Sequence, residues 1–505
     1  MELFSNLALG FSVALTAKNL FYCLIGTIVG TVVGVLPGLG PVATIAILLP
    51  ITFGLEPTTA LIMLAGIYYG ASYGGSTTAI LVNLPGETSS VVTALDGYQM
   101  ARQGKAGEAL VVAALGSFFA GTVGTIIIAA FAPPLGELAL TFGPPEYFSL
   151  MVLGLIAAVV LAHGSIIKAI AMIILGLLLG LVGTDVTSGV ERFTFGVPEL
   201  SDGLDFVVIA MGVFGIGEIV ANLERGEEHR ETFATSTKSL GVWHLSREDF
   251  RRAWPASVRG TLLGSALGIL PGGGATLGAF SSYMMEKKIA KDPSRFGKGA
   301  IEGVAGPESA NNAGAQTSFI PMLTLGLPSN AVMALMIGAL MIHNIQPGPQ
   351  VMTGNPQLFW GLIASMWIGN VLLVILNLPL IGIWIKLLTV EYRLLFPIIL
   401  LLCAVGVYSV SSSSFLVYAT ALFGLIGYIF AKLQCEPAPL LLGFVLGPMM
   451  EENLRRAMTM SGGDASIFVT QPVSLILLLL AAALLVLIAS PALSKRREEA
   501  FQEET

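Results

Sequence analysis

Residues 26–40 read GTIVGTVVGVLPGLG, and this stretch decides how the whole chain is organised. It is an apolar run with a glycine at every fourth position, and it ends in Leu-Pro-Gly. Small residues at this spacing let two helices approach closely in a lipid bilayer. Proline and glycine interrupt a helix, and broken backbone at membrane depth is tolerated only where protein or a watery cavity surrounds it. The stretch therefore predicts a closely packed membrane helix that breaks beside a protected cavity.

The same stretch occurs a second time. Residues 260–274 read GTLLGSALGILPGGG, which is identical to the first stretch at eight of fifteen positions. A Leu-Pro turn at residues 83–86 recurs at 326–329, and a Glu-Tyr pair at 146 recurs at 391. The offsets are 234, 243 and 245 residues, and the three matches follow one order. The chain is therefore predicted to be an internal duplication.

Composition places both halves in a membrane. Of the 505 residues, 54% are hydrophobic and 11% are charged, whereas soluble domains carry about 25% charged residues. The chain has roughly twelve apolar segments. A segment of about 18 residues or more is long enough to span a bilayer. Good examples are residues 148–162 with 166–182, 358–380 and 473–488. Backbone groups in lipid must pair within the segment, so the segments must be helices. We expect an all-α polytopic membrane protein in which several helices are broken or re-entrant.

The placement of lysine and arginine predicts that the two halves are inverted. The joint at residues 53–57 has no basic residue, whereas the equivalent joint at 287–298 has five. Further on the pattern reverses, because Arg102 and Lys105 follow the first Leu-Pro turn and residues 343–356 have none. Basic joints lie on the cytoplasmic side, so equivalent joints lie on opposite sides. Inverted repeats are a common plan of secondary transporters.

These observations divide the chain into five parts and predict its orientation. The long basic stretch between the halves and the Lys-Arg-Arg cluster at 495–497 are both expected in the cytoplasm. The parts are an N-terminal segment (1–19), a first transmembrane repeat (20–221), a charged cytoplasmic linker (222–259), a second repeat (260–490) and a cytoplasmic C-terminal tail (491–505).

Two polar segments inside apolar surroundings are the candidate transport site. Residues 68–86 and 308–330 each gather small hydroxyl and amide side chains and then turn at Leu-Pro. Polar residues within a membrane are costly and usually face a pathway, although single ones also serve as hydrogen-bonding contacts between helices. The predicted substrate-binding residues are Gly74, Gly75, Ser76, Thr77, Thr78, Asn83, Pro85, Gly86, Asn311, Asn312, Gln316, Thr317, Pro328, Ser329 and Asn330.

The residue types in these segments indicate the chemistry of the ligands. No lysine or arginine lies at 57–100 or 299–385, so a bound anion must use backbone N–H groups at helix starts together with hydroxyl and amide donors. Carbonyl groups at unwound helix ends suit Na⁺, and a bound cation offsets the charge of an anion. We expect Na⁺ or H⁺ to be the coupling cation and no other cofactor. A Na⁺ site is expected near Gly38, Gly40, Ser76, Gly272, Gly274, Asn311 and Asn312.

Four acidic residues lie close to these segments. Each of Glu87, Asp96, Glu302 and Glu308 is a candidate proton or cation site. For Asp96 and Glu302 we favour a solvated position near a helix end. For Glu308 a coupling role and a solvated position remain equal alternatives.

The motifs of both halves resemble a known family. GVLPGLGP (34–41), YYGASYGGSTTAIL (68–81), NLPGE (83–87), TALDGYQMARQGKAG (93–107), PESANNA (307–313) and QPGP (346–349) resemble the TctA family. Its members are the large membrane subunits of bacterial tripartite tricarboxylate transporters. On this resemblance, the GGS at 74–76 and the ANN at 310–312 are where the site is expected.

The resemblance also implies partners and a place in the cell. It implies a small TctB-like transmembrane subunit, a TctC-like periplasmic solute-binding protein, and ion-driven uptake of small carboxylates across the bacterial inner membrane. Movement of an elevator-like core within the bilayer is expected, and a nucleic-acid partner is not.

Two other classes of function remain as alternatives. A passive anion channel would favour a symmetric pore built from several subunits, and duplication within one chain favours a carrier. An intramembrane enzyme would need a nucleophile with a positioned base. His163 and His343 are the histidines near membrane segments, and neither lies in a catalytic motif.

Overall fold

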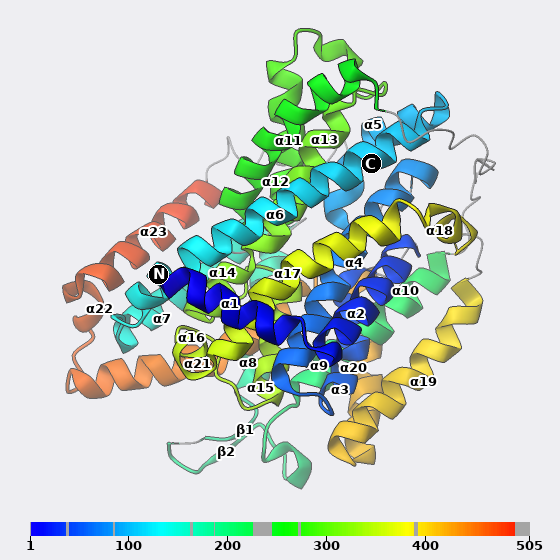
Figure 1. Ribbon diagram of the computed structural model, residues 1–505. Coiled ribbons are helices and arrows are strands. Elements are labelled where there is room, and N and C mark those ends of the chain that lie inside the picture. The colour runs from blue at the N-terminus through cyan, green and yellow to red at the C-terminus, as the bar shows by residue number, and fades with distance from the viewer. Residues whose placement is uncertain are drawn as a thin grey trace.

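The computed structural model describes residues 2–36, 40–83, 86–161, 165–185, 187–225, 245–270, 274–387 and 392–489. The described part is built from helices apart from one short two-stranded hairpin (Figure 1). Three predicted site residues, Gly38, Pro85 and Gly272, lie outside the described residues, as do His163, half of the linker (226–244) and the C-terminal tail.

The elements follow in chain order. The first half contains α1 (Glu2–Ala14), α2 (Ala17–Val35), α3 (Pro41–Thr52), α4 (Pro57–Val82), η1 (Thr88–Ser90), α5 (Val91–Arg102), α6 (Ala106–Ala139), α7 (Pro144–Leu161), α8 (Ile166–Gly180), β1 (Gly183–Thr184), β2 (Glu191–Arg192), η2 (Pro198–Leu200), α9 (Phe206–Ala210), the π-helical η3 (Met211–Gly217) and α10 (Glu218–Arg225). The second half contains α11 (Arg247–Gly268), α12 (Gly274–Ile289), η4 (Pro293–Arg295), α13 (Glu302–Thr317), α14 (Phe319–Leu325), α15 (Ala331–Ile342), α16 (Gln350–Gly354), α17 (Pro356–Asn377), α18 (Ile381–Leu387), α19 (Tyr392–Ser411), α20 (Ser414–Lys432), α21 (Ala438–Met460), α22 (Ile467–Thr470) and α23 (Pro472–Ala489).

The prediction of an all-α polytopic membrane protein is confirmed. Among the described residues, five helices are long and apolar enough to cross a membrane, and seven shorter apolar helices accompany them. Together they match the roughly twelve segments expected from the sequence. In α20, which is one of the long helices, only 22% of the apolar window is buried. Such an apolar outer surface suits contact with lipid rather than water.

The glycine repeats bring two pairs of helices into backbone contact. In the first half α2 packs along α4, and in the second half α11 packs along α13. A Cβ atom added to any of the three repeat glycines within α2 or the three within α11 would collide with a carbonyl oxygen of the partner helix. The colliding pairs are Gly26 with Met63, Gly30 with Ile67 and Gly34 with Ala71, and then Gly260 with Gly306, Gly264 with Ala310 and Gly268 with Gly314. Equivalent positions of the two sequence repeats therefore make the same contacts.

The Leu-Pro turns of the two halves begin with equivalent backbone conformations. Helix α2 ends at Val35, and α3 begins at Pro41. Asn83, which follows α4, is left-handed with φ 55°, and Gly326, which follows α14, is left-handed with φ 70°. Glycine and asparagine tolerate this conformation better than other residues. The second turn therefore has its glycine at the position that asparagine occupies in the first.

A charged cluster anchors the loop between α8 and α9. The β1–β2 hairpin projects from one end of the molecule (Figure 1), and Asp185 lies beside it. Asp185 pairs with Arg455 of α21 at 2.6 Å and with Arg192 at 3.4 Å. The backbone N–H of Ser188 and further hydrogen bonds, helped by the Arg455 charge, lower the pKa of Asp185 to about 2. The carboxylate is therefore charged at any physiological pH and holds the loop against α21.

Candidate functional site

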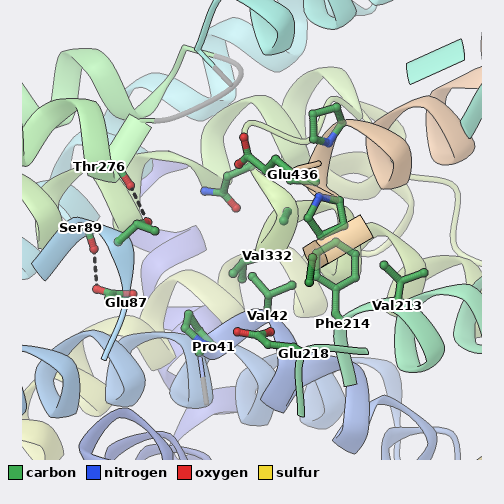
Figure 2. Close-up of a pocket in the computed structure, with 18 of the residues that line it drawn as sticks. Pro41, Val42, Glu87, Ser89, Val213, Phe214, Glu218, Thr276, Val332 and Glu436 are labelled. Atoms are coloured by element: carbon green, nitrogen blue, oxygen red, sulfur yellow. Dashed lines mark hydrogen bonds between the residues drawn. The ribbon is translucent and has the colours of Figure 1, made fainter. Parts of the chain in front are cut away.

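A cavity of about 590 Å³ lies where several helices begin (Figure 2). The starts of α3, α12 and α15 line it through Pro41, Thr276 and Val332. The start of α21 lines it through Pro437 and Ala438. The first N–H groups of a helix have no partner within the helix and carry a partial positive charge. A site built from several helix starts therefore favours an anion without needing a basic side chain.

Local sequence explains why helices begin at this place. Pro41 is the first residue of α3, where its missing N–H costs nothing. Asn330 precedes α15, and its side chain accepts a hydrogen bond of 2.9 Å from the backbone N–H of Met333. Its amide group also lies 3.4 Å from the hydroxyl of Tyr68. The first Leu-Pro turn is thus followed by Glu87, and the second by Asn330 and the start of α15. All of these line the same large cavity.

Acidic side chains share the cavity with the helix starts. Glu87, Glu218 and Glu436 line it, and none of the described lining residues is lysine or arginine. Glu87 accepts hydrogen bonds from Ser89 at 2.6 Å and from Asn311 at 3.0 Å. A cavity with both anion-favouring helix starts and carboxylates is suited to hold an anion together with a cation.

Hydrogen bonds connect the two halves around the cavity. Thr88 and Thr276 share one at 3.1 Å, as Figure 2 shows. Asn311 of α13 reaches Glu87, which follows the first Leu-Pro turn. The candidate site is therefore assembled from residues of both repeats.

A second polar cluster surrounds Glu308, a fully buried residue of α13. Its carboxylate accepts hydrogen bonds from Ser76 of α4 at 2.5 Å and from Thr93 of α5. A small cavity of about 10 Å³ adjoins Glu308 and Ser76 and is also lined by Asn377 at the end of α17. Glu308 is therefore not solvated, and its coupling role stays a prediction.

The predicted site residues divide among several places. Gly40, Gly86 and Asn330 line the large cavity, and Ser76 and Thr77 line the small one. The rest lie near these cavities or between helices. Gly74 packs against α2, and Gly75 lies beside Glu87. Thr78 bonds to the carbonyl of Val35 at 3.0 Å. Asn83 ends α4.

The predicted residues of the second half are mostly packed within the protein. Asn312 donates to Ser117 at 2.7 Å, and Thr317 bonds to the carbonyl of Ala313. Gln316 packs against Gly124, and Gly274 against Gly268. Pro328 is buried, and Ser329 bonds to the carbonyl of Ser318 at 3.3 Å.

Two expectations about acidic residues need correction. Asp96 is fully buried rather than solvated, because the N–H groups of Gly299 and Ala300, each at 2.7 Å, and the hydroxyl of Tyr283 at 3.0 Å satisfy its carboxylate. Glu302 is mostly buried and is paired with Arg252 and Arg295, each at 3.0 Å. Both side chains hold the ends of helices together and lie away from the cavities.

The sequence did not predict one wall of the large cavity. It consists of η3 and α10, with Val213, Phe214 and Glu218, and of the α20–α21 corner with Glu436. These residues are ordinary apolar or acidic residues without a polar cluster around them. One signal was available, namely the two prolines at 437 and 439 after Cys435 and Glu436, which favour a helix start at that corner.

Comparisons with known proteins agree with the resemblance seen in the motifs. The model of the tripartite tricarboxylate transporter TctA family matches residues 20–442. A 52.8 kDa protein of the TAR-I ttuC' 3'region of Agrobacterium vitis is 60% identical over 504 residues, covering 100% of both chains. A protein of the TAR-II ttuC' 3'region of the same organism is 58% identical over 241 residues, covering 48% of this chain and 100% of that one. No solved structure matches the chain.

The family is one of transporters and not of enzymes, which excludes the intramembrane enzyme. The apolar helices and the glycine contacts make the chain a multi-pass membrane protein. On these findings, the chain belongs to the tripartite tricarboxylate transporter TctA family.

Proposed function

We propose that this chain is the permease subunit that carries small carboxylates of the tricarboxylate or dicarboxylate type across a bacterial inner membrane. The observation that supports this most is the cavity of about 590 Å³, which several helix starts face and which has no basic residue among its described lining residues. A carboxylate there would accept hydrogen bonds from backbone N–H groups and from Thr88, Thr276 and Asn330.

The carrier would work with two partners. Membership in a family of tripartite transporters supports a small transmembrane subunit and a periplasmic solute-binding protein that delivers the carboxylate. The charge pattern along the chain supports a cytoplasmic C-terminus.

Cation coupling is proposed because the large cavity contains both groups that attract an anion and groups that repel it. Helix starts favour an anion, whereas Glu87, Glu218 and Glu436 repel it unless a cation is bound too. Na⁺ or H⁺ entering with the carboxylate would remove this repulsion. A passive channel needs no such pairing of charges.

The transport cycle is proposed to be elevator-like. The equivalent glycine contacts support a duplication, and the reversed basic joints support an inverted one, which is typical of secondary transporters. A covalent cross-link between the cavity-bearing helices and α23 at the edge of the molecule (Figure 1) should stop uptake. Full transport by the cross-linked protein would contradict this cycle.

The proposed function is tested by uptake of a panel of radiolabelled carboxylates into cells or proteoliposomes. With both partners present, we expect saturable accumulation that collapses when the Na⁺ and H⁺ gradients are removed. Omission of the binding protein should abolish uptake. Non-saturable flux that stops at equal concentrations would favour the channel, and absence of uptake for every acid would contradict the proposal.

A further inference from the structure

The small cavity at the junction of α4, α6, α13 and α17 holds a buried carboxylate that has no positively charged partner among the described residues lining the cavity. Glu308 is fully buried, and both of its carboxylate oxygens accept hydroxyl hydrogens, from Ser76 and Thr93. None of the described residues lining the cavity is lysine or arginine. Burying a carboxylate without a positive partner is very unfavourable. Something positive must therefore accompany this side chain when it is ionised.

An independent observation points to the same space. Asn377 also lines the cavity and is buried, with 5% of its surface exposed. Its amide nitrogen donates to the carbonyl of Leu373 at 2.9 Å, but its Oδ1 has no donor among the described residues. A buried acceptor without a partner costs about 1–3 kcal/mol. Such an oxygen beside a carboxylate and hydroxyl groups is what a hard cation requires as a ligand.

The size of the cavity limits what can enter. Its volume of about 10 Å³ corresponds to roughly one water-sized particle. The other lining residues are four with hydroxyl groups, Tyr73, Ser76, Thr77 and Ser117, and four apolar ones, Leu110, Ala113, Ala114 and Leu378. The Tyr73 hydroxyl already donates to Asn370 at 2.9 Å, and Ser117 accepts from Asn312 at 2.7 Å. The cavity thus has room for a single small ion, with oxygen-bearing side chains on part of its wall.

We propose that this cavity is a sodium site, in which Glu308 supplies the charge and Asn377 and Ser76 supply further oxygen ligands. The site deepens the cation coupling proposed above and rests on it. It lies apart from the large cavity and differs from the predicted Na⁺ positions, of which it retains only Ser76. Its ligands come from both sequence halves, so a bound Na⁺ would hold α4 of the first half to α13 and α17 of the second.

Sodium binding is tested first without any substrate. The purified protein is heated in choline chloride to which NaCl or KCl is added. We expect NaCl to raise the melting temperature saturably and KCl at equal ionic strength to have no such effect. Glu308→Gln removes the charge with little change of shape and should abolish the response. Glu302→Gln, six residues earlier on α13 and paired with Arg252 and Arg295, is the matched control and should keep it.

Asn377→Leu keeps the experiment decisive if the Glu308 variant does not fold. This change keeps the branched shape of the side chain and removes the unpartnered buried oxygen, so the melting temperature without Na⁺ should not fall. The response to Na⁺ should disappear. An unchanged response in a folded Asn377→Leu or Glu308→Gln protein would overturn the site.

Uptake then separates this inference from the proposed function. In both variants, the Na⁺ concentration for half-maximal carboxylate uptake should rise at least about tenfold, which corresponds to about 1.4 kcal/mol of binding free energy. Carboxylate uptake with the wild-type Na⁺ requirement would refute the sodium site and leave the permease intact. Uptake driven by a pH gradient and indifferent to Na⁺ would make Glu308 a proton carrier and overturn the sodium site. Wild-type protein that binds Na⁺ here but transports no carboxylate would refute the proposed function alone.

Discussion

Gly264→Leu is expected to leave little folded protein in the membrane. A Cβ at this position would lie 2.6 Å from Cα and 2.7 Å from the carbonyl carbon of Ala310, and still closer to its oxygen. These are backbone atoms of α13, which cannot rotate away as a side chain can. Overpacking a core typically costs about 1–3 kcal/mol, and forcing two helices apart along their length should cost at least the upper end. Fluorescence-detected size-exclusion and thermal melting of the detergent-solubilised protein measure the loss.

A matched control tests whether this effect comes from the helix contact. Gly354 at the end of α16 has nothing within 4 Å of an added Cβ, so Gly354→Leu should accumulate and melt like the wild type. Gly30→Leu, at the equivalent position of the first half, should fail as Gly264→Leu does, because Gly30 meets the backbone of Ile67. A stable Gly264→Leu protein would show that α11 and α13 are not in contact at this position.

Thr276→Asp is expected to fold normally and to lose carboxylate uptake. Thr276 lies in the first turn of α12 and lines the large cavity, as Figure 2 shows. A carboxylate in the first turn of a helix is favourable for the helix. A substrate carboxylate at about 4 Å would be repelled by about 4 kcal/mol at an effective dielectric constant of 20. This corresponds to a loss of affinity of about a thousandfold.

The control for this prediction differs only in charge. Thr276→Asn has the shape of the aspartate variant and can still hydrogen-bond to Thr88, so its half-saturation constant for uptake should stay within a few-fold of the wild type. The comparison is made by initial rates over a range of carboxylate concentrations, with equal amounts of protein in the membrane. Equal loss of uptake in both variants would show that the hydroxyl group or the local shape matters, and not an anion in this cavity.

The sequence predicted the features that depend on local pattern. Glycine spacing predicted the contacts of α2 and α11, because a four-residue period places the small residues on one helix face. Proline and glycine predicted the end of α2 and the start of α3. The second Leu-Pro turn pointed to Asn330, which lines the large cavity. Each of these is decided by residues that are neighbours along the chain.

The features that sequence did not predict depend on distant partners. Asp96 looked like a surface residue because its donors, the N–H groups of Gly299 and Ala300, lie about two hundred residues away. No local pattern indicates either that Glu308 and Asn377 line the same small cavity. The polar residues of α13 that were expected around a substrate differ in what they contact, because Asn311 reaches Glu87 at the large cavity, Asn312 bonds to Ser117 of α6, and Thr317 bonds within α13. A helix with polar residues on several faces does not reveal which face meets a cavity.

The central claim is that a carboxylate binds among the helix starts of the large cavity, and a structure of the protein with a bound di- or tricarboxylate tests it most directly. We predict density for the acid within hydrogen-bonding distance of the first turns of α12 and α15, near Thr276 and Asn330. Density for the acid elsewhere, with the space between these helix starts occupied only by water, would contradict the account.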